Sequence, residues 1–262
     1  MSTENQFGRI SRLSLHAGVR DGQTILTDVS FTAPYKVMTP FRKPNGGIQV
    51  MPLCASAGLM RGDRQEISYT VDCGADLEVL SQAFDKIHKM EGGCALRTIT
   101  AEVAKGAVLY CSPQPVIPFA ASAFESKTQI RLADDTSRLY YLEILCCGRN
   151  AYKEQFAYRR FSSQVVITRA GRLIYRDNTL YEPEKMPMRG LGMYEGYTHL
   201  ANLFLSCPEP KVQEEIQELL DEEKLDGGVT RLMEGDLAVR ILGIRAQPLE
   251  DAAEKIKRIW DV

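Results

Sequence analysis

The sequence lacks the short motifs that mark most catalytic and cofactor-binding sites. It contains no G-x-S-x-G, no H-E-x-x-H, no P-loop and no glycine-rich dinucleotide fingerprint. The three histidines, His16, His88 and His199, are far apart, and the seven cysteines never occur as C-x-x-C. Cys146 and Cys147 are adjacent, but neighbouring strand residues point to opposite faces and rarely chelate one ion together. No local catalytic constellation or metal site is therefore encoded, and the scattered cysteines are typical of reduced thiols in a cytosol.

Long apolar runs and a strong charge of either sign are also missing. No apolar run approaches the roughly 18 residues of a membrane span, and the N-terminal stretch MSTENQFGRISRL is polar rather than a secretory leader. A formal net charge of −2 argues against broad nucleic-acid binding. We therefore expect a cytoplasmic protein that binds neither membrane nor nucleic acid, with residues 1–262 forming a single domain.

Alternating hydrophobicity dominates residues 1–207 and predicts strand after strand. Glu66 to Cys73 alternates strictly between apolar and polar residues, the pattern of a half-buried strand. Hairpin turns are predicted at Asp21-Gly22, Lys105-Gly106 and Ala170-Gly171. The expected fold class is mainly β, with layered, mostly antiparallel β-sheets followed by two C-terminal helices, and no repeat is strong enough to indicate a solenoid.

The pattern changes in the C-terminal part, residues 208–262. Apolar residues with helical spacing predict amphipathic helices from about Lys211 to Lys224 and from about Pro248 to Trp260. We place Pro248 in the first turn of the second helix, where its missing N–H is tolerated. Leu237 to Ile244 is predicted to be one more strand.

A carboxylate lies inside the most apolar stretch of the chain. Leu139 to Cys147 is apolar on both faces, as in a strand covered on both sides, and Glu143 lies at its centre. Burying an unpaired carboxylate costs several kcal/mol, so Glu143 needs a cation, donors, a proton or water beside it. Two interpretations are open: Arg149 or backbone donors satisfy a structural glutamate, or Glu143 lines an internal polar passage.

Other polar residues recur at strand ends and inside apolar runs. If folding brings them together, they would line a wet path with oxygen ligands. Oxygen ligands alone bind late first-row metal ions less tightly than imidazole or thiolate, so such a path suits passage better than storage. The residues are Asp63, Ser81, Gln82, Lys86, Glu143, Arg149 and Asp177.

Seven stretches, in this order and at this spacing, resemble the urease accessory protein family UreD, called UreH in some systems. The resemblance covers most of the chain, and the last sixty residues add little to it. The stretches are APYKVMTPF (33–41), SAGLMRGD (56–63), SQAFDKIHKM (81–90), SPQPVIPFAASAF (112–124), LEILCCGRNAYKEQF (142–156), IYRDNTLY (174–181) and MYEGYTH (193–199).

The resemblance implies a mostly antiparallel β fold and a non-catalytic role in nickel-enzyme maturation. It implies partners: a UreF-like protein, through which the heteromeric complex dimerises, a UreG-like GTPase and apo-urease. Nickel would be cargo in transit, with no cofactor bound tightly. We also expect apolar, proline-stiffened stretches such as Ser112 to Phe119 to be exposed and to need covering by a partner.

By resemblance, the residues of the nickel path are Asp63, Glu143 and Asp177, with Ser81 and Gln82. The first loop departs from the family pattern, since it reads Ala57-Gly58-Leu59 and Arg61-Gly62-Asp63 where many members have Pro-Gly-Gly and Gly-Gly-Asp. Many members also have glycine where this chain has Lys153.

Two other functions compete with this interpretation. One is a hydrolase that joins Cys111 or Cys146 to His88 or His199 in the folded chain, since a nucleophile and its base need not be close in sequence. The other is a metallochaperone that stores nickel, against which the shortage of clustered His and Cys argues.

Overall fold

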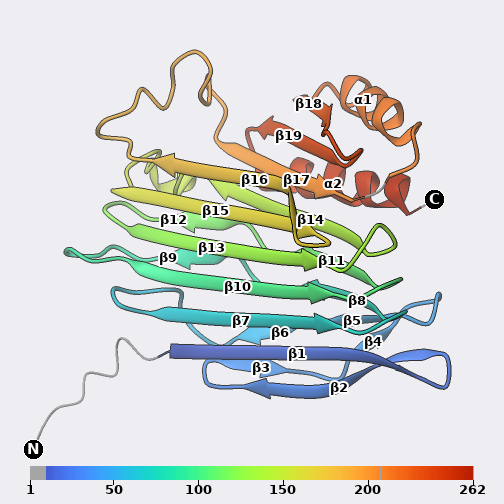
Figure 1. Cartoon of the computed structure of the whole chain (residues 1–262). Coiled ribbons are helices and arrows are strands. Elements are labelled where there is room, and N and C mark those ends of the chain that lie inside the picture. Colours follow the sequence, from blue (N-terminus) through green and yellow to red (C-terminus); the bar gives the residue numbers. More distant parts are fainter. Residues whose placement is uncertain (1–9, 207, 262) are drawn as a thin grey trace, which may run out of the picture.

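The structure is a computed structural model that describes residues 10–206 and 208–261. Residues 1–9, 207 and 262, which belong to the predicted single domain, lie outside the described part. The described chain is mainly β with two helices, which confirms the predicted class. Two large sheets face each other, and both helices lie beside the ten-stranded one (Figure 1).

The first layer is a seven-stranded sheet in the order β16-β15-β13-β10-β7-β1-β2. Its outward residues are mostly polar and its inward residues mostly apolar, as the alternation predicted. The bounds are β1 Ile10–Arg20, β2 Gln23–Phe31, β7 Arg64–Val71, β10 Ala95–Val103, β13 Ala123–Leu132, β15 Arg160–Arg169 and β16 Arg172–Tyr181.

The second layer is a ten-stranded sheet with a main path of β18-β19-β17-β14-β11-β8-β5-β4. Two short strands lie off this path: β12 pairs with β14 and with β9. Strands β3 (Tyr35–Val37) and β6 (Pro52–Cys54) form a separate pair. The bounds are β4 Phe41–Arg42, β5 Ile48–Val50, β8 Asp76–Leu80, β9 Asp85–Ile87, β11 Val108–Ser112, β12 Val116–Pro118, β14 Arg138–Cys146, β17 His199–Leu205, β18 Asp226–Arg231 and β19 Leu237–Gly243.

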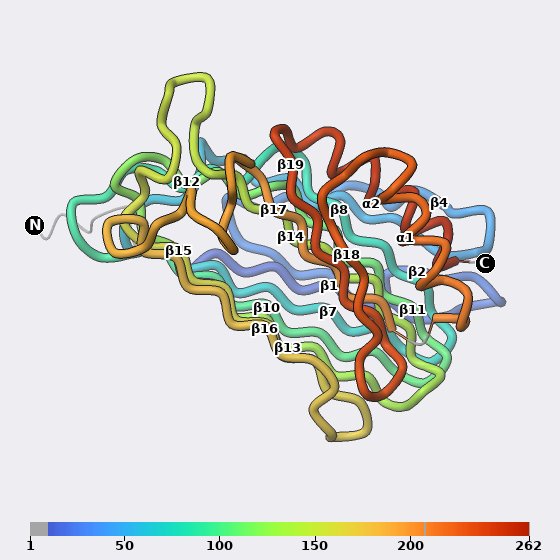
Figure 2. Tube along the Cα trace, turned by 90° about the horizontal axis from the view of Figure 1, so that it is seen from above, coloured from blue at the N-terminus to red at the C-terminus, as the bar shows by residue number. Residues whose placement is uncertain are grey.

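The chain winds between the two sheets instead of folding back within one (Figure 2). From β7 to β15, successive long strands go to alternate sheets, so that β7, β10, β13 and β15 become parallel neighbours. The prediction of mostly antiparallel sheets was therefore wrong for the centre of the molecule. Alternating hydrophobicity is the same in both directions and cannot distinguish parallel from antiparallel pairing.

The three turn predictions illustrate the same limit. Asp21-Gly22 and Ala170-Gly171 close the hairpins β1–β2 and β15–β16, as predicted. Lys105-Gly106 does not close a hairpin, because β10 and β11 belong to different sheets. A glycine turn therefore marks a change of direction, but the next strand can pair in either layer.

Strand β14 is covered on both faces, as predicted for Leu139 to Cys147. Leu139 and Tyr141 pack between the sheets, whereas Tyr140 and Leu142 pack under the helices. The hydroxyl of Tyr140 donates to the backbone oxygen of Ala253 at 2.7 Å and ties the strand to the last helix.

The helices α1 (Val212–Glu222) and α2 (Ala246–Trp260) lie within two residues of their predicted bounds. Helix α2 begins two residues before Pro248. The proline still lies in the first turn, where its missing N–H removes no intrahelical hydrogen bond. No helix in the described part is long and apolar enough to cross a membrane.

The stretch Ser112 to Phe119 is not the exposed apolar surface that we expected. Its side chains are buried or half-buried, because Val116 pairs with both β14 and β9. Large exposed apolar side chains lie elsewhere, among them Phe31, Met38, Phe41 and Leu191.

Docking of α2 should contribute strongly to stability. Ile256 is fully buried between α2 and the sheet, so Ile256→Ala should lower the free energy of unfolding by about 2–5 kcal/mol. The control Ile244→Ala, at a site that is 62% exposed, should change it by less than about 0.5 kcal/mol. Denaturant unfolding followed by fluorescence of Trp260, the single tryptophan, measures both. Equal effects would contradict the packing described.

Candidate functional site

Three cavities follow one another between the two sheets. They measure about 430, 60 and 30 Å³, and we call them the mouth, middle and inner cavities. The mouth and middle cavities share Cys54, Gln65, Gln82 and Asp85 in their walls. The middle and inner cavities share Arg97, Ile99 and Pro113. The three cavities therefore form a row along the interior of the molecule.

One wall of this row is a line of polar residues that crosses six strands of the seven-stranded sheet. Each member is the register partner of the next, so the line runs perpendicular to the strands. With strands about 4.8 Å apart, it spans roughly 24 Å. We call it the polar row: Ser11 (β1), Gln65 (β7), Arg97 (β10), Ser126 (β13), Ser163 (β15) and Thr179 (β16).

The polar row divides the interior into two apolar clusters. On β10, Ala95 belongs to one cluster and Ile99 to the other, with Arg97 between them. On β15, Phe161 and Val165 flank Ser163 in the same way. The row is therefore a continuous polar seam through an otherwise apolar sandwich.

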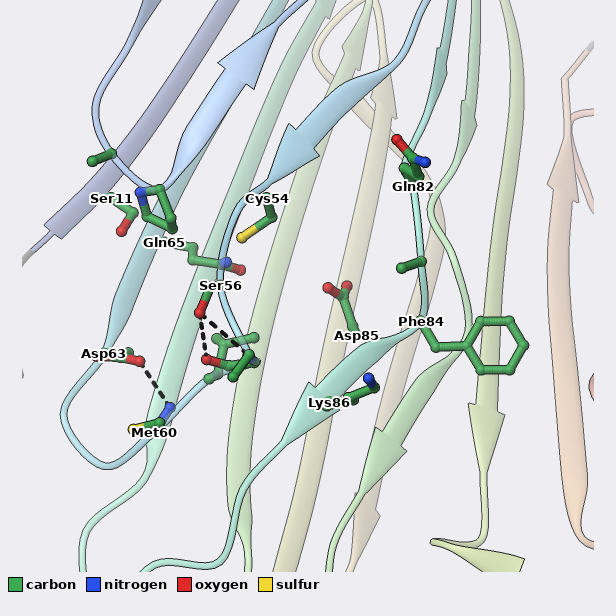
Figure 3. A pocket seen from close by; sticks show the side chains of 16 residues that line it. Ser11, Cys54, Ser56, Met60, Asp63, Gln65, Gln82, Phe84, Asp85 and Lys86 are labelled. Carbon is green, nitrogen blue, oxygen red and sulfur yellow. Dashed lines mark hydrogen bonds between the residues drawn. The ribbon is translucent and has the colours of Figure 1, made fainter.

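The loop from Ser56 to Asp63 builds the mouth cavity (Figure 3). Asp63 accepts a hydrogen bond from the backbone N–H of Met60 at 2.8 Å, which closes the loop. Gly58 has a φ of 137°, and a Cβ there would lie 2.4 Å from the backbone oxygen of Lys86, so only glycine fits. Arg61 is exposed and donates to the backbone oxygen of Glu91, so this departure from the family loop does not line the cavity.

Ser81 and Gln82 follow β8 and line the middle cavity. The hydroxyl of Ser81 accepts a hydrogen bond from the backbone N–H of Gln114 at 2.7 Å, which fixes its place in the wall. Both residues therefore lie in the row of cavities.

Glu143 lies in the wall of the inner cavity, on β14. Its carboxylate accepts from the Ser163 hydroxyl at 3.1 and 3.2 Å. Burial raises the pKa of Glu143, while hydrogen bonds from Tyr141 and Ser163 oppose that rise. Arg149 is not its partner, contrary to one of the two interpretations, because its guanidinium pairs with Glu154 and stacks over Phe119.

Asp177 lies beyond the inner cavity, on the inward face of β16. It accepts from Arg240 at 2.9 Å and is close enough to Glu143 for its charge to raise the pKa of that residue. Arg240 is the register partner of Asn202, and Asn202 is the partner of Glu143, so these residues extend the opposite wall.

The predicted path residues are therefore aligned but not clustered. Asp63 lies at one end, Ser81 and Gln82 in the middle, and Glu143 with Asp177 at the other end. Among residues 10–206 and 208–261, no three His, Cys, Asp or Glu side chains form a group that could hold a metal ion.

Sequence reasoning missed all six members of the polar row, among them the buried Gln65, Arg97, Ser126 and Ser163. The signal was present, since each occupies a core-facing position of an alternating strand. Arg97, between Ala95 and Ile99, is the clearest case.

Lys153, where many family members have glycine, has a φ of 60°, in the left-handed region that favours glycine.

The cysteines and histidines of the hydrolase alternative do not form an activated pair. Cys146 and His199 are register partners, but burial raises the pKa of the Cys146 thiol and lowers that of His199 to about 4. Burial likewise raises the pKa of Cys111 to about 12. His88 contacts the backbone oxygen of Ala57. A nucleophilic cysteine needs the opposite conditions, a lowered thiol pKa and a competent base.

The fold and site define a class: a two-sheet β protein with a polar seam through its interior. Residues 9–261 match the model of the family described as UreD urease accessory protein. The chain is 36% identical to urease accessory protein UreD of Acetivibrio thermocellus, covering 98% of this chain and 99% of that protein. It is 35% identical to UreH of Helicobacter pylori strain G27, covering 97% and 96%. The chain therefore belongs to the UreD family of urease accessory proteins.

The raised pKa of Glu143 predicts a pH-dependent stability difference. Below the ordinary glutamate pKa of about 4.5 the carboxyl is neutral in both folded and unfolded chains. As pH rises through the raised pKa, the folded chain loses stability because a charge must be buried. Glu143→Gln mimics the neutral form, so its melting temperature should rise relative to the wild type between pH 4.5 and 8. Thermal unfolding at several pH values checks this. A difference in melting temperature that stays constant with pH would contradict it.

Proposed function

We propose that this protein is a non-catalytic scaffold of urease maturation that binds a UreF-like protein, a UreG-like GTPase and apo-urease in the cytoplasm. Membership of the urease accessory family supports this role. The raised pKa of the Cys146 thiol and the lowered pKa of His199 favour this role over the hydrolase. In this proposal the assembly dimerises through the UreF-like partner, and nickel is its cargo.

We further propose that the row of cavities conducts nickel, with Asp63, Ser81, Gln82, Glu143 and Asp177 along the path. The observation that carries this proposal is the polar row, which keeps oxygen and nitrogen atoms in register across the interior. A structural role alone would require only scattered, satisfied polar groups. The negative charge at each end attracts a divalent cation into an interior that would otherwise exclude it.

Weak ligation favours passage over storage. The path offers carboxylate, hydroxyl and amide oxygens, which hold nickel less tightly than imidazole or thiolate does. Each carboxylate also already accepts a hydrogen bond from the protein, and nickel must compete with that donor. An ion bound in this way can leave again, which a delivery path requires.

Two carboxylate variants test the conduit. Glu143→Gln and Asp177→Asn keep size and remove charge. Urease matured with either should contain at least about twofold less nickel, because an amide oxygen attracts a divalent cation less strongly than a carboxylate does. Complexes with the UreF-like and UreG-like partners should be recovered normally. The measurements are complex recovery and nickel per urease active site. Glu102→Gln, on the outer face of β10, is the matched control and should change neither.

The outcomes separate the conduit from a structural role. Normal assembly with normal nickel content would exclude a conduit role for these residues. Loss of assembly would instead make Glu143 a buried structural acid, held by Ser163.

The isolated, reduced protein should bind nickel weakly. Its oxygen ligands are hard and its soft ligands dispersed, so we expect a dissociation constant well above about 1 μM. Titration calorimetry measures it. A stoichiometric submicromolar site would overturn this expectation and favour a nickel-storing metallochaperone.

A further inference from the structure

The polar row contains one fixed positive charge. Arg97 is 7% exposed and lines both the middle and the inner cavity. Burial opposes its charged form, but the Asp85 carboxylate outweighs burial and keeps the pKa of Arg97 above its usual value. A guanidinium therefore stands where a cation must pass between the two cavities.

The partners of Arg97 come from opposite walls. On its own sheet, Nε donates to the Gln65 side chain at 2.8 Å, and the guanidinium lies 5.3 Å from the centroid of the Phe124 ring. From the other wall, Asp85 on β9 accepts from Nη2 at 2.8 Å. The Arg97–Asp85 ion pair thus bridges the two sheets across the row. If that bond breaks, Gln65 and Phe124 still hold the guanidinium.

We propose that the Arg97–Asp85 ion pair is the gate of the row of cavities and selects which cation passes it. The inference rests on the proposed conduit. A cation that arrives in the mouth cavity meets Asp85, which lines both the mouth and the middle cavity. It advances only by binding the Asp85 carboxylate, whose negative charge offsets the repulsion between the cation and the Arg97 guanidinium.

This exchange discriminates between metals. Manganese lies at the weak end of the affinity series for divalent ions and nickel near the strong end. Magnesium gives up its bound waters reluctantly. Nickel therefore competes for Asp85 better than these ions do. Once nickel holds Asp85, the negative charges of Glu143 and Asp177 lie ahead of it.

Two variants distinguish a gate from a structural ion pair. Asp85→Asn leaves the Arg97 guanidinium without its partner and removes the carboxylate that a cation would bind first. Nickel per urease active site should therefore fall about fivefold or more. Arg97→Met/Asp85→Asn removes both charges and should restore nickel delivery towards the wild-type level. Removing both charges would also rescue a purely structural pair, but there the nickel loss in Asp85→Asn would come with lost complex recovery, whereas a gate leaves complex recovery normal. The surface pair of Arg131 and Glu102, with N–O distance 3.0 Å, supplies the control variants Glu102→Gln and Arg131→Met/Glu102→Gln.

Loss of selectivity is the second readout. With excess manganese during maturation, nickel per active site should fall in Arg97→Met/Asp85→Asn and remain unchanged in the wild type. Complex recovery is measured for every variant. If complexes containing Asp85→Asn are not recovered, the manganese competition with the double variant is the only test of the gate. If excess manganese then affects the double variant no more than the wild type, the gate is overturned.

The gate and the conduit fail in different ways. If Glu143→Gln leaves nickel content normal, the conduit is wrong and the gate falls with it. If Glu143→Gln lowers nickel but the double variant neither rescues Asp85→Asn nor becomes sensitive to manganese, the conduit stands and the gate is overturned.

Discussion

The parallel register of the seven-stranded sheet is the constraint on which the rest of the interior depends. Neighbouring strands place one inward polar residue at the same level, and the polar row results. Since side chains alternate between faces, a slip of one residue in β10 would turn Arg97 outward and Leu96 and Thr98 inward. The winding of the chain between two sheets secures this register, because β7, β10 and β13 are each bounded by a crossing at both ends.

A polar seam inside a sandwich is costly unless its members satisfy one another. Arg97 is held by Gln65 and Asp85, and Glu143 by Ser163. The apolar clusters on either side, anchored by residues such as Phe124 and Ile99, supply the burial that offsets this cost. The arrangement therefore separates stability, which lies in the flanking clusters, from the polar path, which can remain loosely packed and cavity-bearing.

Much of the local structure can be predicted from the sequence, whereas the pairing of the strands into sheets cannot. The helices and the doubly covered strand β14 could be predicted because their periodicity is local. Glu143 was found because a carboxylate within an apolar run is conspicuous. Arg97, Gln65 and Ser126 were missed, since each alone is one polar exception in an amphipathic strand. Only the register between strands far apart in sequence makes them neighbours, and alternation contains no information about register or strand direction.

The carboxylates along the row share one property that bears on transport. Asp63 accepts from a backbone N–H, Asp85 from Arg97, Glu143 from a hydroxyl and Asp177 from Arg240. In the proposed conduit, an ion at any of these carboxylates gains a charged ligand but displaces a donor, so no position would bind it much more tightly than its neighbours. Four bare carboxylates would attract nickel more strongly and release it more slowly. A path that must both accept and deliver an ion is therefore better built from hydrogen-bonded carboxylates than from free ones. The same donors hold those side chains in place when no ion is present.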